Sequence, residues 1–503
     1  MPIDDYTMDK EGDNMFENIR EQNIYKNLLD GKWVQSSSNK NIKIHSPRNN
    51  SVVGMIQAMT KEEVDLSIAS SNAAAKVWRD VPINERAVIL NKAALLLEEN
   101  MLELYKVLQY EIGKDKESSI SEITRSADFI RFTADEGKHM EGKTILGDSF
   151  PGFNKNKISL VTRVPLGTVL AISPFNYPIN LSVSKIAPAL IAGNSVILKP
   201  PTSGSISALH MAEIFNKAGL PKGVLNTVTG KGSDIGDYLV THKGIDFINF
   251  TGSTEVGRHI ASMAGMVPTL LELGGKDAAL VLDDADLDLA AKEIASGAFS
   301  YSGQRCTAIK RVIVLNSIAP ALICKIKAIA ENLRVDAIRE DCEIVPLINM
   351  KAADFVQELI DDAINKGANL ILGNKRIDNL IYPTIFDNVT SDMRIAWEEP
   401  FGPILPIIRV NSIEEAVKVT NSSKYGLQAS IFTNNINKAF FIADKLQVGT
   451  VQINGKTERS PDHFPFSGFK SSGMGTQGIR YSIEAMSKIK SIVLNLEDFN
   501  EVK

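Results

Sequence analysis

Two segments of the chain, GTVLAISPFNYP (167–178) and GNSVILKPPTSGS (193–205), share one design. Each is an apolar run typical of a β-strand, followed by a turn rich in proline, glycine or serine. The design recurs in GVLNTVTGKGSDIGDYL (223–239) and DFINFTGSTEVGRHIA (246–261). Four strand–turn–helix units in succession favour a parallel, doubly wound sheet. Ligands of such sheets bind at the carboxyl ends of the strands, so these loops are predicted to form one binding site.

Further apolar runs predict a second α/β domain: DAALVLDD (277–284), KRVIVLN (310–316), ANLILGN (368–374), ASIFTN (429–434) and GTVQING (449–455). Two strand-like segments, NKISLVTRVP (156–165) and SKIKSIVLNLEDF (487–499), are far apart in the chain. We expect them to pair as an outlying flap that contacts another subunit.

Composition excludes several classes of function. The chain has 503 residues and a net charge of −5, which argues against nucleic acid or an anionic membrane as the main partner. Its three cysteines make neither a disulfide framework nor a CxxC pair, so we expect a reducing compartment and no metal site. Residues 1–22 lack a signal or transit pattern and are predicted to be an acidic flexible tail. No run of 18 apolar residues occurs, so we expect a cytoplasmic protein without a spanning helix.

Cys306 lies in the polar stretch SGQRCTA (302–308), directly after Arg305. A buried, inert cysteine normally lies within an apolar run. A cationic neighbour and a nearby helix end both favour the thiolate, so Cys306 is a candidate nucleophile. A structural cysteine is the alternative interpretation.

Two other stretches carry candidate catalytic groups. Glu272, in LLELGGKDAAL (270–280), has apolar neighbours, and desolvation raises a carboxyl pKa toward that of a general base. A salt-bridged glutamate at a turn is the alternative. Asn176, in SPFNYP (173–178), lies between two prolines, and its amide is a candidate donor to an oxyanion. An ordinary asparagine turn is the alternative here.

FTGSTEVG (250–257) places glycines and hydroxyl side chains between a strand and a helix. A helix start there offers backbone N–H groups to a phosphate. The stretch is neither a P-loop nor a GxGxxG motif, and a tight turn without a ligand is the alternative. In ILKPPT (197–202), Lys199 is a candidate cation near a ribose or an additional phosphate, although a solvated lysine is the simpler interpretation.

Together these stretches resemble the aldehyde dehydrogenase superfamily over about residues 25–500. Six motifs carry the resemblance in order: SPFNYP, LKPPT, FTGSTEVG, LELGGKDAAL, GQRCTA and EEPFGPILP (398–406). The family usually has tryptophan before the asparagine, whereas this chain has Phe175 and keeps an apolar ring.

The resemblance implies an α/β, aldehyde dehydrogenase-like fold with two doubly wound parallel-sheet domains and a small β oligomerisation flap. The expected divisions are a dinucleotide-binding domain (23–150 and 167–276), a catalytic domain (277–475) and the flap (151–166 and 484–503). It also suggests a homotetramer assembled through the flap segments.

The mechanism that the resemblance implies begins when Cys306 attacks the aldehyde carbon. The Asn176 amide and the Cys306 backbone N–H would hold the oxyanion of the thiohemiacetal. Hydride transfer to a nicotinamide would leave a thioester, which a water activated by Glu272 would hydrolyse. The chemistry is consistent, because oxidation needs a tetrahedral adduct that can expel hydride and a thioester that reacts readily with water.

The resemblance also implies the cofactor residues. Glu399 would hold the nicotinamide ribose with Phe401 close to the ring, Gly252 and Ser253 would lie at the pyrophosphate, and Ser173 would lie at the cofactor loop. Thr202 stands where many NAD-using members carry a glutamate that repels a 2′-phosphate. With Lys199 supplying charge, we predict NADP. Asp237 is expected either to contact the adenosine end or to cap its helix.

The substrate follows from the arginines, because a guanidinium matches a phosphate or carboxylate. The resemblance to one subfamily, whose members oxidise glyceraldehyde 3-phosphate with NADP and without phosphorylation, implies a phosphate clamp and a pocket-lining threonine. The clamp residues are Arg125, Tyr177, Arg305 and Arg459, and the threonine is Thr307. The expected product is 3-phosphoglycerate. Each arginine taken singly is more often a surface residue.

Three alternative functions stay open. A lactaldehyde or succinate-semialdehyde dehydrogenase of the same fold would show little preference for a phosphorylated aldehyde. A cysteine hydrolase would need a histidine base, yet among the six histidines only His463 lies in a candidate loop. A non-catalytic protein would be expected to lack Cys306, Glu272 or Asn176, and the chain contains all three.

Overall fold

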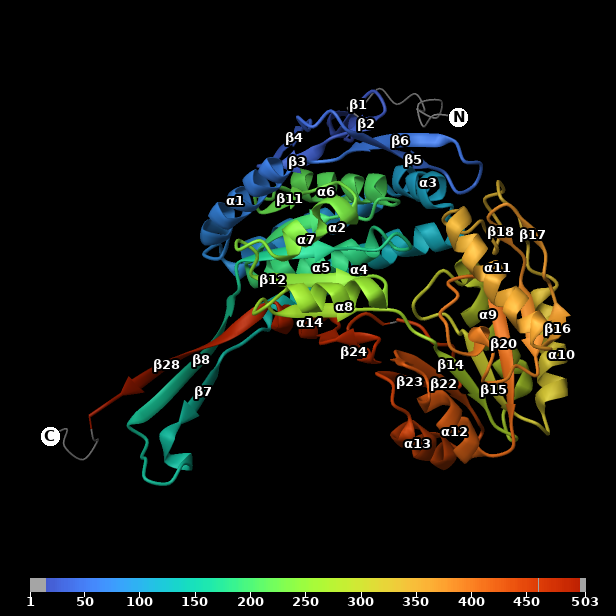
Figure 1. Ribbon diagram of the computed structural model, residues 1–503. Helices are drawn as coiled ribbons and strands as arrows, with labels where there is room; N and C mark the ends of the chain where they lie inside the picture. Colours follow the sequence, from blue (N-terminus) through green and yellow to red (C-terminus); the bar gives the residue numbers. More distant parts are fainter. Residues whose placement is uncertain (1–14, 460, 498–503) are drawn as a thin grey trace.

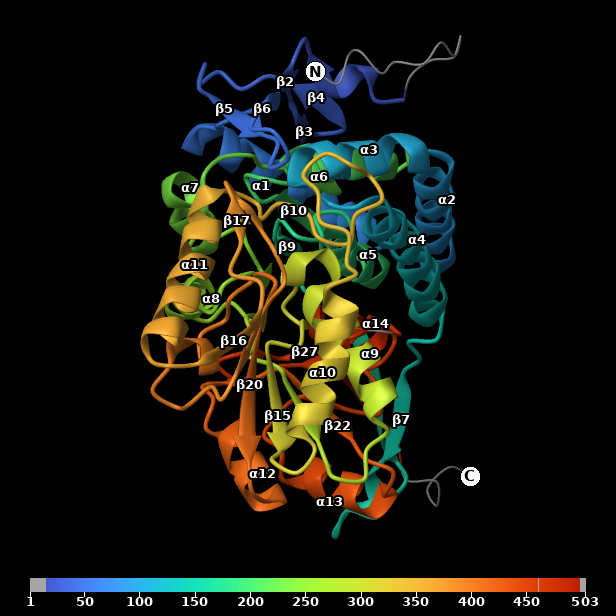
Figure 2. The same cartoon turned by 90° about the vertical axis from the view of Figure 1, so that its right-hand side faces the viewer.

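The computed structural model describes residues 15–459 and 461–497. It contains two open α/β sheets and a long arm of antiparallel strands that projects away from both (Figure 1). Figure 2 shows the same arrangement turned by a quarter, with the second sheet and its helices facing the viewer.

The first large sheet has the strand order β11-β10-β9-β12-β13-β26. The strands are β9 (Thr168–Ile172), β10 (Ser195–Lys199), β11 (Leu225–Thr227), β12 (Phe247–Thr251), β13 (Thr269–Glu272) and β26 (Gly473–Met474). All pairs are parallel except that of β13 with β26. This order places β9 at the centre, so the loops after β9, β10 and β12 open at one edge.

Helices cover both faces of this sheet because successive side chains of a strand point in opposite directions. In β9, Val169 and Ala171 pack on the side of α5 (Asn180–Ala192) and α6 (Ser205–Ala218). Leu170 packs on the other side. That face is covered by α1 (Lys61–Trp78), α7 (Gly232–Val240) and α8 (Thr254–Met263). A sheet buried on both faces explains why its strands are continuous apolar runs.

Three more helices form a further layer outside α5 and α6: α2 (Ile83–Glu99), α3 (Met101–Ile112) and α4 (Lys116–Lys138). Local capping fixes where such helices begin. Thr60 caps α1 in a reciprocal pair with Glu63, and Asp115 caps α4. Six short strands lie toward the N-terminus: β1 (Arg20–Glu21), β2 (Ile24–Tyr25), β3 (Asn27–Leu29), β4 (Lys32–Val34), β5 (Asn41–His45) and β6 (Val52–Gln57).

The second large sheet has the order β16-β19-β20-β15-β14-β22-β23. Its strands are β14 (Ala278–Val281), β15 (Arg311–Leu315), β16 (Asn369–Leu372), β19 (Thr384–Asp387), β20 (Ile404–Val410), β22 (Gln428–Phe432) and β23 (Thr450–Ile453). Only β16 runs antiparallel to its neighbour. The predicted α/β class with two parallel-sheet units is confirmed.

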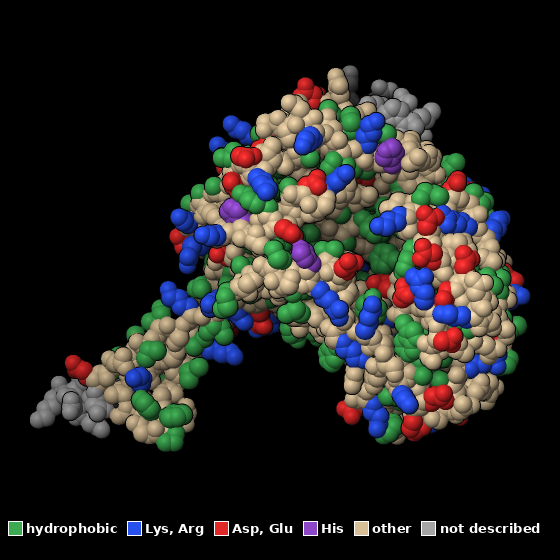
Figure 3. Space-filling view, in the orientation of Figure 1, with side chains coloured by type: hydrophobic (Ala, Val, Ile, Leu, Met, Phe, Trp, Pro, Cys, Tyr) green, Lys and Arg blue, Asp and Glu red, His purple; other side chains and the backbone are tan. Residues whose placement is uncertain are grey.

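Helices α9 (Leu287–Phe299) and α10 (Ala319–Ala330) cover one face of the second sheet, and α11 (Met350–Asn365), α12 (Ile413–Asn421) and α13 (Ile436–Lys445) cover the other. The surface is hollowed where the two parts of the molecule meet (Figure 3). Short paired strands complete this half and its return to the first sheet: β17 (Arg376–Ile377), β18 (Leu380–Ile381), β21 (Tyr425–Gly426), β24 (Phe466–Ser467), β25 (Phe469–Lys470) and β27 (Thr476–Gln477).

The arm is the predicted flap. Strand β28 (Ser487–Asn495) follows α14 (Ile479–Ala485) and pairs antiparallel with all nine residues of β8 (Lys157–Pro165). A third strand, β7 (Lys143–Leu146), pairs with β8 from within the stretch that the sequence assigned to residues 23–150. All four residues of β7 are exposed, so the segment carries no buried apolar pattern that would mark it as a strand. Of the predicted tail, residues 1–14 lie outside the described residues. Residues 15–22 are not a tail: they include η2 (Glu17–Ile19) and β1, and Phe16 and Ile19 are buried in the core beside the first sheet.

Within the described ranges, no helix is both long enough and apolar enough to cross a bilayer. The same residues hold no group of three or more His, Cys, Asp or Glu side chains arranged to bind a metal ion.

Candidate active site

Cys306 follows a strained turn. The short helix η4 (Ser300–Gly303) contains Tyr301 and Ser302 at φ of 51° and 54°, in the left-handed region that costs non-glycine residues about 1–3 kcal/mol. The Ser302 hydroxyl donates to the Val345 carbonyl at 2.7 Å and accepts from the Val345 N–H at 2.8 Å. This pair of bonds ties the turn to a neighbouring loop and so fixes the backbone that presents Cys306.

Cys306 lines a cavity of about 560 Å³ at the carboxyl ends of β9, β10 and β12. Many of the sequence-predicted site residues line the same cavity: Ser173, Asn176, Thr202, Gly252, Ser253, Glu399 and Phe401. They come from four separate loops. The structure therefore brings the candidate nucleophile and most of the candidate nucleotide ligands to one place, as expected for the edge of a parallel sheet.

Ser253 caps the N-terminus of α8, where its hydroxyl accepts from the Val256 N–H at 3.3 Å. The start of α8 thus faces the cavity with backbone N–H groups, an arrangement suited to a phosphate. Lys199 is the last residue of β10 and does not itself line the cavity. It is 6% exposed, and its Nζ donates to the Pro200 carbonyl at 3.0 Å. Burial lowers the pKa of Lys199 to about 8. Asp237 lies within α7, outside the cavity wall, where it pairs with His259 at 2.8 Å. The alternative that it caps its helix is wrong, because Lys231 is the N-cap residue.

Glu399 is held from two sides. Its Oε1 accepts from the Gly275 N–H at 3.1 Å and lies 3.2 Å from the Nζ of Lys310. A side chain at Gly274 would begin 2.1 Å from Glu399 Oε2, so the glycine of the GGK stretch leaves room for this carboxylate in the position observed. Phe401 has a positive φ of 49° and packs edge-on against Phe175, with ring centroids 5.9 Å apart.

Asn176 is buried, and its Nδ2 donates to the Gln304 carbonyl at 2.9 Å. The amide is therefore directed at the loop that carries Cys306. The backbone carbonyl of Asn176 accepts from the Nζ of Lys114 at 2.9 Å, and Lys114 pairs with Glu122 at 2.5 Å. This fully buried ion pair fixes the asparagine. It was not identified from the sequence, because no motif marks Lys114, in the loop between α3 and α4, or Glu122, within α4.

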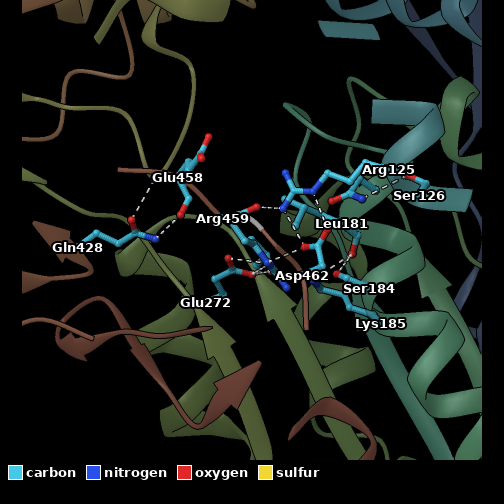
Figure 4. Close-up of polar contacts among 12 residues, drawn as sticks. Arg125, Ser126, Leu181, Ser184, Lys185, Glu272, Gln428, Glu458, Arg459 and Asp462 are labelled. Atoms are coloured by element: carbon cyan, nitrogen blue, oxygen red, sulfur yellow. Dashed lines mark hydrogen bonds and ion pairs between the residues drawn. The ribbon is translucent and has the colours of Figure 1, made fainter. Parts of the chain in front are cut away.

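Glu272 ends β13 and is 4% exposed. Its two oxygens accept from the Nη1 of Arg459 at 3.0 and 2.9 Å (Figure 4). Its Oε2 also accepts from the Thr251 hydroxyl at 3.0 Å. The salt-bridged glutamate that the sequence left open as an alternative is therefore present in this structure.

Lys185 of α5 extends the Glu272 network. Its Nζ donates to Thr251 Oγ1 at 2.7 Å and to the Leu181 carbonyl at 3.1 Å. Burial lowers the pKa of Lys185 to about 7, opposed by the charge of Glu272. Sequence reasoning missed both Lys185 and Thr251. The only signal was the position of Thr251 directly before the glycine of the FTGS stretch.

Arg125 and Arg459 meet through Asp462, another residue that the sequence did not indicate. Arg125 makes two hydrogen bonds to the Asp462 carboxylate, at 2.6 and 2.8 Å, and also donates to the Arg459 carbonyl (Figure 4). Arg459 lies 3.6 Å from the same carboxylate. Two of the three predicted clamp arginines thus lie together, beside Glu272.

The other predicted substrate residues are arranged differently. The Arg305 guanidinium is 8% exposed and donates to the Gly297 carbonyl at 2.5 Å, so it is directed at the end of α9. The Tyr177 ring packs under the Nζ of Lys114, which is 3.3 Å from its centroid. Thr307 is buried, and its carbonyl accepts from the Thr457 hydroxyl at 2.8 Å.

The surroundings of Cys306 disfavour the thiolate. Burial raises the pKa of the thiol to about 12, and the negative charge of Glu272 adds to the effect. Lys310 is the cation that lowers it. The sequence ascribed this role to Arg305; the structure turns that guanidinium toward Gly297 and places Lys310 beside the nucleophile loop instead.

The comparisons with known proteins agree with this site. The model of the aldehyde dehydrogenase family matches residues 33–492. The chain belongs to the aldehyde dehydrogenase family. An NADP-dependent glyceraldehyde-3-phosphate dehydrogenase of Streptococcus equinus is 56% identical over 472 residues, covering 94% of this chain and 99% of that protein. The enzyme of the same name from Arabidopsis thaliana is 49% identical, covering 96% of this chain and 98% of its own length.

A solved structure shows the same fold. The NADP-dependent glyceraldehyde-3-phosphate dehydrogenase of Bacillus halodurans C-125, complexed with NADP, superimposes with a TM-score of 0.93 at 52% identity. The match covers 94% of this chain and 99% of that one. The predicted family and fold are therefore confirmed.

Proposed function

We propose that this chain is an NADP-dependent glyceraldehyde-3-phosphate dehydrogenase that forms 3-phosphoglycerate without phosphorylation. The observation that carries the proposal is the cavity that Cys306 shares with Thr202, Ser253 and Glu399. It combines a nucleophile with groups suited to a dinucleotide. The names of the relatives that match nearly the whole chain support the same activity and cofactor.

The residues present fit NADP. The N-terminal N–H groups of α8 and the Ser253 hydroxyl suit the pyrophosphate, and Glu399 suits the ribose hydroxyls beside the nicotinamide. Thr202 lines the cavity without a negative charge, and Lys199 lies close behind it in sequence. When bound, the cofactor supplies the hydride acceptor. The residues of the chain position the aldehyde, form the covalent bond to it and transfer protons.

Cys306, once deprotonated, attacks the aldehyde carbon, and the thiohemiacetal oxyanion forms beside the Cys306 N–H and the Asn176 amide. After oxidation at that carbon, the acyl group remains on sulfur as a thioester. A water activated by Glu272 attacks the thioester, the C–S bond breaks, and the thiol is regenerated with the carboxylic acid product. Because water is the nucleophile, inorganic phosphate is not consumed.

Arg459 has two competing partners in this scheme. In this structure its Nη1 donates to both oxygens of Glu272. A substrate phosphate that draws Arg459 away leaves Glu272 with the Thr251 hydroxyl and frees an oxygen for water. Binding of the anionic end of the substrate would thus release the general base. The clamp roles of Arg125, Tyr177 and Arg305, and the pocket role of Thr307, belong to the same proposal.

An absorbance assay for NADPH tests the activity. With glyceraldehyde 3-phosphate and NADP in phosphate-free buffer, we expect NADPH to form with one equivalent of 3-phosphoglycerate. Added inorganic phosphate should leave the rate unchanged. Turnover that requires phosphate would overturn the hydrolytic step. Equal efficiency with lactaldehyde or succinate semialdehyde would replace the substrate, and no turnover with any aldehyde would favour a hydrolase or a non-catalytic protein.

The NADP preference predicts the effect of Thr202→Glu. With the cofactor bound in this cavity, a carboxylate at position 202 would repel a 2′-phosphate and would offer acceptors to a 2′-hydroxyl. We expect the Kd for NADP to rise by about 10- to 100-fold, which corresponds to about 1.4–2.8 kcal/mol, while the Kd for NAD stays level or falls. Fluorescence titration measures both constants. Thr202→Gln is the matched control, because it adds the same bulk without charge. Equal loss in both variants would contradict the electrostatic explanation.

Assembly and location are also proposals. The flap strands expose large apolar side chains, among them Ile489 at 62% and Ile492 at 52%. A flap of this kind gains stability when another subunit covers it, which supports the homotetramer. The cytoplasmic location expected from the sequence remains a proposal. The domain divisions at 23–150 with 167–276, 277–475, and 151–166 with 484–503 remain proposals too.

A further inference from the structure

Lys310 is a buried lysine that the mechanism above does not use. It lies one residue before β15 and is 2% exposed. Its backbone N–H donates to the Asp277 carbonyl at 2.9 Å, which fixes it beside the first residue of β14. Burying an ammonium group is costly unless it is paired, so its contacts are expected to matter.

The Nζ of Lys310 joins two parts of the active site. It donates to the backbone carbonyl of Cys306, four residues earlier in the chain. It also lies 3.2 Å from Oε1 of Glu399, the oxygen that accepts from the Gly275 N–H. One ammonium group therefore contacts both the peptide of the nucleophile and the carboxylate that lines the nucleotide cavity.

Several charges face the Cys306 thiol. Glu272 on β13, Glu399 after η5 (Arg394–Ala396) and Asp277 before β14 are acidic, and each raises the pKa of the thiol. Lys185 on α5 also interacts with the thiol. Lys310 opposes the acidic groups.

Among the described residues, Lys310 forms its ion pair with Glu399, and Asp277 is a second carboxylate whose charge it meets. Burial raises the pKa of Asp277 to about 7, and the charge of Lys310 opposes this shift. Lys276 and Arg311 are further buried basic residues. Burial, with the charges of Arg311 and Lys310, lowers the pKa of Lys276, whose Nζ has no hydrogen-bond partner among the described residues. Glu399 is therefore the anion that balances Lys310.

We propose that Lys310 is a positioning residue that couples the ribose-binding carboxylate Glu399 to the loop of the Cys306 nucleophile. It holds the Cys306 carbonyl in place, and it offsets the charge of Glu399 so that this anion does not suppress formation of the thiolate. The inference rests on the proposed function only in taking Glu399 as the ribose ligand.

The test uses a chain in which Cys324→Ser removes the exposed cysteine. It compares this parent chain with the same chain carrying Lys310→Met. The first readout is the rate at which iodoacetamide alkylates Cys306, followed by peptide mass spectrometry from about pH 7 to 10. Below a thiol pKa of about 12, the rate should rise about tenfold per pH unit. Loss of the Lys310 charge raises the thiol pKa further, so Lys310→Met should be about tenfold slower at each pH.

A double-variant cycle isolates the coupling. Glu399→Gln in the Lys310→Met background removes the anion that Lys310 no longer offsets, so we expect alkylation to recover most of the lost rate. Lys310→Arg should also recover it. The Kd for NADP is measured by fluorescence. Lys310→Met should raise this Kd several-fold when residue 399 is Glu. In the Glu399→Gln background, adding Lys310→Met should leave the Kd unchanged. Lys325→Met, at an exposed lysine, is the control and should match the unchanged chain.

The inference is overturned if Lys310→Met alkylates at the original rate, or if adding Glu399→Gln leaves the slow rate unrelieved. Thermal unfolding shows whether Lys310→Met is folded. If it is not, the alkylation rates of Lys310→Arg and of the double variant Lys310→Met, Glu399→Gln are compared instead. Neither readout contains an aldehyde. A different physiological substrate would therefore leave these results unchanged, and failure here would leave the proposed reaction standing.

Discussion

Cys306→Ser should lower NADPH production from glyceraldehyde 3-phosphate by about 10⁴-fold or more, a loss typical of removing a nucleophile. The Cys306 sulfur lines the cavity and is suited to forming an acyl bond. Compared with this thiol, a serine hydroxyl is less acidic and is a poorer leaving group at the hydrolytic step. The cavity walls that suit the nucleotide do not depend on the sulfur. The Kd for NADP should therefore stay within about twofold, since no ion pair or hydrogen bond to the cofactor is removed.

Steady-state absorbance measures the NADPH rate, and fluorescence titration measures NADP binding on the same preparation. Cys324→Ser is the matched control, because Cys324 is exposed on α10 and should be silent. Survival of NADPH production in Cys306→Ser would show that the nucleophile is misassigned. Loss of NADP binding alongside activity would mean that the substitution disturbs the strained turn at Tyr301 and Ser302 rather than the chemistry alone.

Arg459→Leu should lower kcat/KM for glyceraldehyde 3-phosphate by about 100- to 1,000-fold, equivalent to about 3–4 kcal/mol for a desolvated charge pair. Most of the effect should appear in KM. For uncharged glyceraldehyde the loss should be about tenfold or less. The difference arises because only the phosphorylated aldehyde carries an anion that Arg459 can bind after leaving Glu272.

Parallel kinetics with the two aldehydes test this expectation. Arg409→Leu is a control of comparable character, because Arg409 makes its own carboxylate pair with Asp387 on neighbouring strands β19 and β20. It should affect both substrates equally and slightly. If Arg459→Leu reduces the two efficiencies by the same factor, Arg459 acts on Glu272 alone and the phosphate clamp is wrong.

Much of the fold was predictable because its signals are local. The runs around Val169, Val196 and Ile248 are apolar on both faces of the strand, which indicates a sheet covered on both sides. The glycines and prolines that follow them mark where each strand ends, and the topology of a parallel sheet then brings those ends together. Strand β7 escaped prediction because its exposed residues carry no such pattern.

The candidate site divides in the same way. Residues within three positions of a strand end, such as Ser173, Thr202 and Ser253, line one cavity with Cys306. This is expected because the carboxyl ends of parallel strands meet at one edge of the sheet. Their individual roles remain predictions. Partners that reach the site from distant segments were not identifiable, among them Lys185 and Asp462.

The sequence alone therefore determined the class of fold, the edge of the sheet at which the site lies, and the identity of the cysteine and glutamate as candidates. Periodicity and turn chemistry act between near neighbours in the chain, and those features depend on nothing else. Only the tertiary structure decided that Arg459 pairs with Glu272 across 187 residues of sequence, that Arg305 turns toward α9, and that Lys310 lies between Cys306 and Glu399. Such contacts arise when loops from separate strands close on one another, and the direction of a side chain there is set by burial and by the charges that it meets.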